Sequence, residues 1–310
     1  MTVATALPML LTEVTVASTV RLSPSFVRIE LASPDFAELG VDGPWLDQRF
    51  KLVVPHASGA LTSVEGADES WVSTWLERPV EERGHMRTYS VRDVVGSEAD
   101  TRLMVDVVVH EGGPSGPGAD WALAARPGDR AVVQAPRRGH AFGGIEFAPA
   151  PGARLLLVGD ETAVPAICRV LGDLPADAAG AAYVEVPDAL DVQDVPRPDG
   201  VDVTWLVRGG AGHGERLHAA VLDHLGTPVA GALEVDEVDP DLWETPLYSS
   251  SGEPLPDPAS GPEHADLHAW IAGESAMVTG LRRHLVKELG VDRRQVAFMG
   301  YWRRGVAMKG

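Results

Sequence analysis

The sequence of 310 residues contains a single cysteine, Cys168, so it can form neither a disulfide framework nor a zinc site built from several cysteines. It has no apolar run of 18 residues, and we therefore expect no membrane-spanning helix and no membrane insertion. The first residues, MTVATALPMLLTEV, lack a basic segment and a long apolar core, so no secretory signal is expected. These absences predict a cytoplasmic protein.

Basic residues are missing from one long stretch of the chain. Leu217–Leu281 contains no Lys or Arg and twelve Asp or Glu, whereas Arg282–Gly310 contains eight basic and two acidic residues. One interpretation is a solvated acidic loop beside a basic helix face, and the other is a basic C-terminal patch that attracts an anion. The net charge of −19 argues against a nucleic-acid partner. No pattern marks an interface, so a monomer is the default expectation.

The N-terminal half has the pattern of an antiparallel β-structure. Segments rich in Val, Ile, Thr and Phe are separated by turn signals, and one more strand follows a Pro-Gly turn; they cover residues 12–22, 25–33, 48–55, 86–95, 102–110 and 127–136. A Gly/Pro-rich loop interrupts the series, and Asp120 is expected to cap a short helix from Trp121 to Ala125. This part of the chain predicts an antiparallel barrel.

The pattern changes at residues 149–153. The next segment, RLLLV (154–158), is a continuous apolar run typical of a buried parallel strand, and strands then alternate with helical patterns to the C-terminus. Such alternation favours a parallel sheet with helices on its faces. We therefore predict two domains, a β-barrel over 1–150 and an α/β domain over 151–310.

An acidic segment rich in Pro, Gly and Ser, at about 226–265, separates the last two predicted helices. One interpretation is an unstructured insertion, because such a composition buries little apolar surface. In the other, its central LWETPLY folds over a site or a partner, with Trp243 and Tyr248 as anchors.

The stretch HMRTYSVR reads as a strand in which Arg87 and Tyr89 share one face while Thr88 and Ser90 share the other. An ordinary amphipathic strand with a surface arginine has the same pattern. Four further motifs follow, namely DVVVH (106–110) with GPGADW (116–121), GDETAVP (159–165), WIAGE (270–274) and GYWRRG (300–305).

These five motifs, in this order and over nearly the whole chain, resemble the siderophore-interacting protein family. Its members are FAD-dependent ferric-siderophore reductases of the ferredoxin-NADP reductase superfamily. The resemblance implies a Greek-key FAD-binding barrel followed by a Rossmann-like, parallel-sheet domain that binds NADPH or NADH.

For FAD, the resemblance assigns the diphosphate to Arg87, the isoalloxazine ring to Tyr89 and the flavin N5 to Ser90, with Tyr89 and Ser90 as the catalytic residues. A guanidinium fork, an aromatic face and a hydroxyl suit these roles chemically. The other implied FAD residues are Thr88, Asp106, His110, Gly116, Pro117 and Trp121. His110 is equally consistent with a core histidine.

For the nucleotide, GDETAVP stands at the carboxyl end of the first α/β strand, the default ligand crevice of an open parallel sheet, although it lacks GxGxxG. The resemblance implies a site formed by Gly159, Asp160, Glu161, Thr162 and Ala163. Thr162 would meet a phosphate, while Asp160 and Glu161 would cap the helix or contact ribose. Arg208 follows a later strand; it would read a 2′-phosphate, favouring NADPH, or it is a surface charge.

Two further groups complete the expected site. Tyr301 and Trp302 end the last strand and would cover the flavin ring, although core packing is an equal alternative for Trp302. A basic rim would steer an anionic ferric siderophore, unless its members are ordinary solvated charges; it consists of Lys51, Arg137, Arg138, Arg303 and Arg304.

The resulting hypothesis is an NAD(P)H-dependent ferric-siderophore reductase for iron acquisition. Hydride would pass to FAD, and single electrons would then pass to the ferric siderophore and release Fe(II). The alternatives are a general flavin-linked reductase, one fed by ferredoxin, and a non-catalytic siderophore-binding protein.

Overall fold

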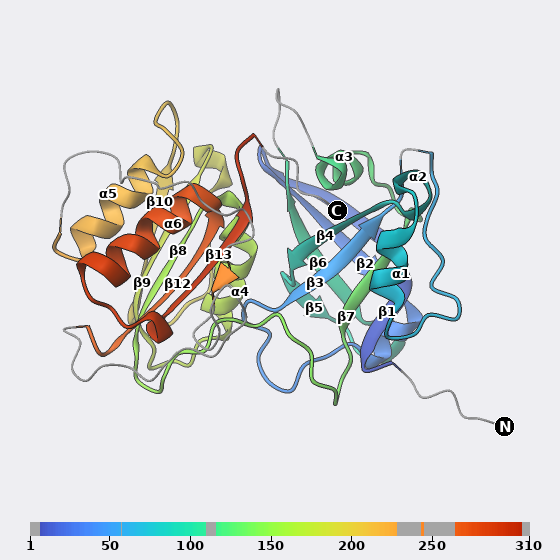
Figure 1. The fold of residues 1–310 in the computed structure, drawn as a ribbon, viewed down its shortest axis with the longest axis horizontal. Helices are drawn as coiled ribbons and strands as arrows, with labels where there is room; N and C mark the ends of the chain where they lie inside the picture. Colours follow the sequence, from blue (N-terminus) through green and yellow to red (C-terminus); the bar gives the residue numbers. More distant parts are fainter. Residues whose placement is uncertain (1–6, 57, 110–115, 228–242, 245–263, 306–310) are drawn as a thin grey trace. The chain divides into compact units, whose positions relative to one another are not determined.

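The computed structural model describes residues 7–56, 58–109, 116–227, 243–244 and 264–305, so His110, Tyr248 and most of the acidic segment lie outside the described residues. The chain forms two compact units, Met1–Ile145 and Glu146–Lys309, each with its own sheet (Figure 1). None of the helices described combines the length and apolar character needed to cross a membrane.

The first unit is a seven-stranded antiparallel sheet in the order β4-β3-β7-β1-β2-β6-β5, curled around one apolar core. Its strands are β1 (Met9–Ser23), β2 (Phe26–Ala32), β3 (Arg49–Val54), β4 (His85–Ser90), β5 (Asp93–Val95), β6 (Arg102–Val108) and β7 (Arg130–Pro136). Alternate residues of the strands enter the core, as the period of two requires. The predicted antiparallel barrel is confirmed.

The barrel closes at the corner between β4 and β5. The sequence predicts one strand over 86–95, but β4 pairs with β3 at one edge of the sheet and β5 pairs with β6 at the other. Between them, the Val91 N–H donates to Gln48 O (2.8 Å) and the Arg92 N–H donates to Met104 O (3.0 Å). The chain therefore changes partner strand directly after Ser90, and this change breaks the predicted strand.

Among the described residues, three α-helices accompany the barrel: α1 (Trp71–Glu77), α2 (Val80–Arg83) and α3 (Pro117–Ala124). The sequence does not predict α1, because seven residues are too few for a helical period. Its Trp71 and Trp75 pack against Val53 and Val132. The expected cap at Asp120 is wrong, since α3 begins with Pro117 after an N-cap at Gly116. Proline suits a first helical position because its missing N–H would lack a helical partner there.

The second unit is a doubly wound sheet in the order β10-β9-β8-β12-β13-β11. The first five strands are parallel: β8 (Arg154–Gly159), β9 (Ala179–Val186), β10 (Val201–Val207), β12 (Leu267–Glu274) and β13 (Val296–Trp302). Helices α5 (Glu215–His224) and α6 (Ser275–Arg283) cover one face, and α4 (Val164–Asp173) lies on the other (Figure 1). The predicted α/β fold is confirmed.

The strand order reverses between β8 and β12, because β9 and β10 extend the sheet to one side while β12 and β13 extend it to the other. Open α/β sheets bind ligands at the carboxyl ends of the strands beside such a switch point. In this unit the switch point is flanked by Gly159 and Gly273. The fold thus brings the GDETAVP and WIAGE motifs together.

Two residues inside the acidic segment, and the end of the helix after β12, add detail. The two-residue strand β11 (Trp243–Glu244) pairs antiparallel with β13 at Met299 and Phe298. The helix after β12 is α6, which is followed by a π-turn at His284–Glu288. Gly290 follows with a φ of 65°, the left-handed conformation that ends many helices.

His268 near the start of β12 predicts acid sensitivity of the fold. Its side chain is 3% exposed, Nε2 is buried without a hydrogen bond, and burial lowers its pKa to about 4. Burial keeps the His268 ring neutral in the folded state, whereas the unfolded chain takes up a proton below about pH 6.5. The free energy of unfolding is therefore highest above this pH and falls as the pH is lowered toward 4. Between pH 7 and pH 5 the cost is about 2 kcal/mol. Denaturant unfolding should record a flatter pH dependence for His268→Phe than for the native chain, and identical curves would contradict the assignment.

Candidate functional site

The RTYS segment places its side chains on opposite faces of β4, as predicted. Cross-strand pairs are Arg87 with Leu52 and Tyr89 with Phe50, whereas Thr88 pairs with Lys51. Leu52 and Phe50 belong to the barrel core, and the rings of Phe50 and Tyr89 lie 6.4 Å apart. Arg87 and Tyr89 therefore share the face that carries the core.

Helix α3 approaches this face of β4 so closely that a side chain is excluded at Gly118. A Cβ on Gly118 would overlap the Tyr89 phenol oxygen and would lie 3.5 Å from Arg87 Cγ. The glycine of GPGADW thus allows the helix to lie against the two side chains of RTYS. Two motifs about 30 residues apart form one cradle.

The cradle fits FAD. Arg87 is half-buried, donates to Met86 O (2.7 Å) and has no carboxylate partner among the residues described. Beside it, the first turn of α3 has no side-chain cap, and the amides of Gly118 and Ala119 precede the helical hydrogen bonds. A guanidinium and free helix amides suit a diphosphate. Burial raises the pKa of Tyr89 to about 12, so its phenol stays neutral beside a ring.

Ser90 ends β4 at the barrel corner. It is buried, and its hydroxyl has no hydrogen-bond partner in the described part of the chain. The corner is held by Asp106, whose carboxylate binds Arg28 through two hydrogen bonds (2.7 and 2.8 Å) and lies 3.3 Å from Arg92 Nε. Asp106 is completely buried by these arginines. This corrects its expected role as a direct cofactor ligand, because it instead fixes the segment that follows Ser90.

The predicted basic rim has three members in the first unit. The Lys51 ammonium donates to Thr88 Oγ1 (2.7 Å) on the face opposite Arg87, and burial, together with Arg49, lowers the pKa of Lys51. Arg137 forms an ion pair with Glu38. Arg138 donates to Leu39 O at 3.3 Å. Lys51 is thus partly desolvated, whereas Arg137 is already neutralised.

Asp160, the first residue after β8, is the centre of the second unit's site. Its carboxylate is fully buried and accepts hydrogen bonds from the Thr162 N–H and hydroxyl (2.9 and 2.5 Å) and from the Glu274 N–H (2.8 Å). It also accepts from the Trp302 indole N–H (2.9 Å). Thr162 was expected to meet a phosphate, but both of its donors are directed at Asp160.

Glycine makes this arrangement possible at the neighbouring strand. Gly273 has a φ of 142°, and a Cβ there would lie 2.7 Å from the Asp160 carboxyl carbon. The WIAGE motif therefore supplies both the space for Asp160 and one of its donors. The GDET, WIAGE and GYWRRG motifs meet at this carboxylate.

Next to Asp160, Arg208 joins two further buried carboxylates. Its Nε lies 2.7 Å from Glu185 Oε1, and its two terminal nitrogens bind both oxygens of Glu161. Glu161 and Glu185 are fully buried, and the Arg208 side chain is 16% exposed. The interpretation of Arg208 as a surface charge is therefore wrong. The pairing also argues against a 2′-phosphate role, because the Arg208 guanidinium already binds Glu161 and Glu185.

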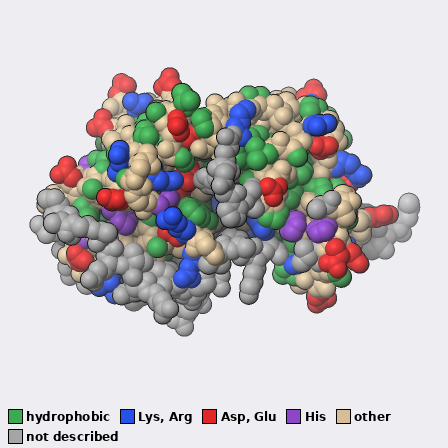
Figure 2. Space-filling view, turned by 90° about the horizontal axis from the view of Figure 1, so that it is seen from above, with side chains coloured by type: hydrophobic (Ala, Val, Ile, Leu, Met, Phe, Trp, Pro, Cys, Tyr) green, Lys and Arg blue, Asp and Glu red, His purple; other side chains and the backbone are tan. Residues whose placement is uncertain are grey.

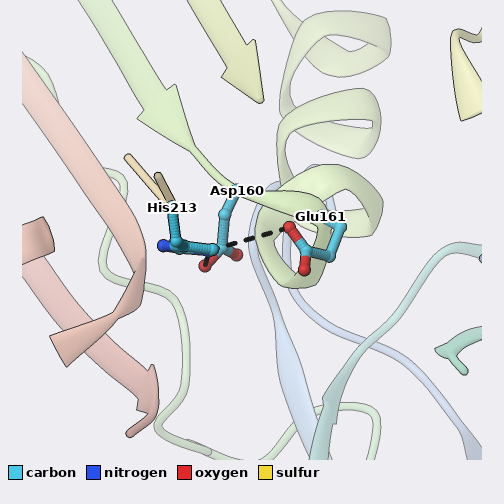
Figure 3. A group of neighbouring side chains, drawn as sticks. All are labelled: Asp160, Glu161 and His213. Carbon is cyan, nitrogen blue, oxygen red and sulfur yellow. Dashed lines mark ion pairs between the residues drawn. The ribbon is translucent and has the colours of Figure 1, made fainter. Parts of the chain in front are cut away.

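His213 completes the cluster with Asp160 and Glu161 (Figure 3). Its Nε2 lies 3.3 Å from Asp160 Oδ2 and 3.9 Å from Glu161 Oε2, and in the close-up the His213 and Asp160 side chains point toward each other. Burial alone would lower the pKa of His213, but Asp160 outweighs burial and the net pKa is raised. For Asp160, burial is likewise outweighed by its donors, so its pKa is lowered, whereas burial and Asp160 raise the pKa of Glu161.

The same three side chains have the spacing of a metal site. Their chemistry does not favour one. The Asp160 oxygens already accept four hydrogen bonds, and Glu161 is bound by the Arg208 guanidinium. A cation would compete with these donors for the same lone pairs. We therefore interpret the cluster as a charge network.

The end of β13 is tied to this network. The Ser275 hydroxyl donates to Trp302 O (2.9 Å), and the Arg304 N–H donates to Glu274 Oε1 (3.2 Å). The His213 ring meets the Trp302 ring edge-on at 5.3 Å. Tyr301, Trp302 and Arg303 are half-buried here. Trp302 is thus held by polar anchors at the carboxyl end of the sheet.

Sequence reasoning missed His213, Glu185 and Glu274. Glu185 is the penultimate residue of β9, Glu274 ends β12, and His213 stands in the glycine-rich RGGAGHG after β10. Position at the carboxyl end of a parallel strand would have identified the two acids, and the glycine-rich loop after β10 is the signal for His213.

Comparisons with known proteins agree with both units. Residues 15–140 match the siderophore-interacting FAD-binding domain, and residues 152–305 match the siderophore-interacting protein model. The chain belongs to the siderophore-interacting protein family. A ferredoxin reductase of carbazole 1,9a-dioxygenase shares the fold, at 15% identity and a TM-score of 0.54 over 96% of this chain and 71% of that one. These matches confirm the predicted FAD-binding unit and the predicted ferredoxin reductase fold.

Similar proteins include the ferric vibriobactin reductase ViuB of Vibrio cholerae, 27% identical over 92% of this chain and 86% of that protein. The NADPH-dependent ferric-chelate reductase of Escherichia coli is 26% identical over 94% and 92%. A siderophore utilization protein from T. fusca has a crystal structure with a TM-score of 0.67, at 28% identity over 97% of this chain and 96% of that one.

Gly118→Ala tests the cradle. The added methyl group should push α3 away from Tyr89, lowering the free energy of unfolding by about 1–3 kcal/mol and weakening FAD binding. Gly143→Ala is a matched control, because a Cβ there meets nothing within 4 Å. Denaturant unfolding and flavin titration measure both effects, and equal behaviour of the two variants would refute the close approach.

His213→Gln tests the charge network. Because the folded pKa of His213 is raised, its stabilisation is complete below the unfolded pKa of about 6.5 and is lost as pH rises through the folded value. The native chain should therefore lose more stability above pH 6.5 than the variant does. Unfolding curves recorded from pH 6 to pH 9 measure this difference, and a variant with an unchanged pH slope would exclude an imidazolium at this position.

Proposed function

We propose that this protein is an NAD(P)H-dependent ferric-siderophore reductase that uses FAD and releases Fe(II) for iron acquisition. The observation that carries the proposal is the cradle of Arg87, Tyr89 and Gly118, in a chain of the siderophore-interacting protein family. The names of the V. cholerae and E. coli relatives support a ferric chelate as the electron acceptor.

In this proposal each residue of the cradle has one role. Bound FAD supplies the redox chemistry, accepting hydride from a reduced nicotinamide and giving single electrons to ferric iron. Arg87 and the amides of Gly118 and Ala119 would hold the diphosphate, and Tyr89 would pack against the ring. The Ser90 hydroxyl lies at the corner fixed by Arg92 and Asp106, where it would hydrogen-bond the flavin N5.

The nucleotide would bind at the switch point of the second unit, where parallel strands present their carboxyl ends. Asp160 sits there, directly before Glu161 and Thr162, and it takes the donors of Thr162 that a phosphate would otherwise use. This observation favours a second candidate, a reductase of the same fold that is fed by ferredoxin. The basic segment after Leu281 keeps a docking face for an acidic partner open.

A ferric siderophore would be attracted by the basic rim. Lys51 suits this role best, because it is partly desolvated and has no carboxylate partner among the residues described. Acidic and basic side chains are interspersed over the described residues on the face in Figure 2, so steering by a few placed cations suits this surface better than a broad basic patch. A cytoplasmic location and a monomeric state stay predictions.

Substitutions on β4 separate binding from electron transfer. Arg87→Ala should weaken FAD binding about 10–100-fold, because a charge-assisted hydrogen bond contributes about 1.5–3 kcal/mol. Ser90→Ala should keep FAD and slow iron reduction about fivefold, the equivalent of one neutral hydrogen bond. Arg130→Ala, at an exposed pair with Glu13, serves as the control. Flavin titration and anaerobic turnover measure these effects, and the opposite pattern would reverse the assignment of the strand.

Anaerobic mixing tests the whole reaction. The purified flavoprotein should bleach with NADH or NADPH and regain its colour with a ferric siderophore. Bleaching by reduced ferredoxin alone would support the second candidate. A protein that binds a siderophore but no flavin would support the non-catalytic alternative and overturn the proposal.

A further inference from the structure

The pairing of Arg208 with two buried acids bears on the choice of electron donor. Three of the five N–H groups of its guanidinium are directed at Glu185 and Glu161. Both carboxylates are fully buried, so the arginine is their main source of neutralisation. Arg208 directly follows β10, Glu185 is the penultimate residue of β9, and Glu161 lies two residues after β8.

We propose that this network makes the second unit select a pyridine dinucleotide without a 2′-phosphate, so that NADH rather than NADPH is the electron donor. The inference rests on the proposed function, since it concerns the same nucleotide site. In doubly wound sheets an acid near the end of the second strand suits the ribose hydroxyls of NADH, whereas a free arginine suits the 2′-phosphate of NADPH. Glu185 is the penultimate residue of β9, the second strand of this unit.

The charge balance at this edge disfavours a 2′-phosphate. Three buried carboxylates, those of Asp160, Glu161 and Glu185, face Arg208 and the His213 imidazole. An exposed acid, Asp188, follows β9 two residues after its end. Even when His213 is protonated, the three carboxylates outnumber the two positive charges, so this cluster carries a net negative charge. A phosphate dianion would add repulsion here, whereas a neutral ribose diol would not.

Arg208 cannot serve a 2′-phosphate without cost to the protein. Turning the guanidinium outward would break its ion pairs with the buried Glu161 and Glu185, and breaking one side of a buried ion pair is strongly unfavourable. The Arg208 guanidinium is held by geometry as well as by charge, because Nε donates to Glu185 and the terminal nitrogens donate to Glu161. The network therefore selects against the phosphate by occupying its natural ligand.

Glu185 also has a free acceptor. Its Oε1 accepts from Arg208 and from the Gly214 N–H (2.9 Å), whereas Oε2 is buried without a hydrogen bond. Buried carboxylate oxygens are rarely left unpaired, and a ribose hydroxyl is a suitable donor. The segment 209–214, GGAGHG, covers this end of the strand, and its glycines allow the backbone shift that access requires.

Arg216 is the remaining cation near the end of β10. It is exposed, lies in the first turn of α5, donates to Val207 O (2.8 Å) and has no carboxylate partner in the described part of the chain. It is the residue that would bind a 2′-phosphate if the network did not select against one. Replacing Arg216 therefore tests directly whether the site binds NADPH through its 2′-phosphate.

The first experiment is calorimetric titration of the FAD-loaded protein with NAD⁺ and NADP⁺. NAD⁺ should bind at least about tenfold more tightly, the discrimination expected from one unfavourable charge contact. Stopped-flow mixing gives the second readout, in which hydride from NADH and one solvent proton reduce FAD and leave NAD⁺. NADH should bleach the flavin faster than NADPH at equal concentration.

Variants identify the cause of the preference. Glu185→Gln removes one acid and loosens Arg208, so the ratio of NAD⁺ to NADP⁺ affinity should fall about tenfold. Asp202→Asn is the matched control, because it removes the same charge at the exposed start of β10 and should leave the ratio unchanged. If Glu185→Gln fails to fold, Glu161→Gln tests the same pairing, and the native comparison stands without either variant.

The outcomes distinguish the inference from the proposed function. Equal or tighter binding of NADP⁺ by the native protein, or a loss of NADP⁺ binding in Arg216→Ala, overturns the inference and leaves the nucleotide-fed reductase intact. If neither NADH nor NADPH reduces the flavin, the nucleotide-fed function itself fails, and the preference fails with it.

Discussion

The second unit depends on one buried carboxylate. Asp160 follows β8 at the point where the strand order reverses, and it gathers donors from Thr162, Glu274 and Trp302. These donors come from its own turn, from β12 and from β13, which lie side by side in the sheet. A buried charge must be paired or hydrogen-bonded, so the need to satisfy Asp160 fixes the positions of three strand ends at once.

A comparable constraint organises the barrel. Asp106 is buried between Arg28 and Arg92, and Arg92 belongs to the corner where the chain passes from β4 to β5. Fixing this corner also fixes Ser90, which directly precedes it. The opposite face of β4 is shaped by sterics instead, because only glycine at position 118 lets α3 reach Tyr89. In both units, then, the side chains of the proposed binding sites are positioned by a buried acid and a missing Cβ.

The fold was predictable because its signals are local. Alternating β-branched residues indicate the barrel, and the apolar run at 154–158 followed by helical periods indicates the parallel sheet. The five motifs also indicate the family. What the sequence could not reveal is pairing between distant residues. Asp106 has the residue type of a ligand and Arg208 that of a phosphate binder, and only the register of β2 with β6 and of β9 with β10 shows that their charges are already matched.

This distinction explains why the arrangement of side chains on β4 was easier to predict than the arrangement at the switch point. On β4 the relevant side chains are neighbours in sequence, so the period of a strand already tells which of them share a face. At the switch point, the acids and their partners come from three separate strand–loop junctions, and a residue such as His213 acquires its meaning only from Asp160 across the sheet. A carboxylate near a strand end can be paired with a cation of a ligand or with a cation of the protein itself. In this unit the protein's Arg208 pairs with Glu161 and Glu185. The proposed selectivity against a 2′-phosphate follows because Arg208 is then not free to bind that phosphate.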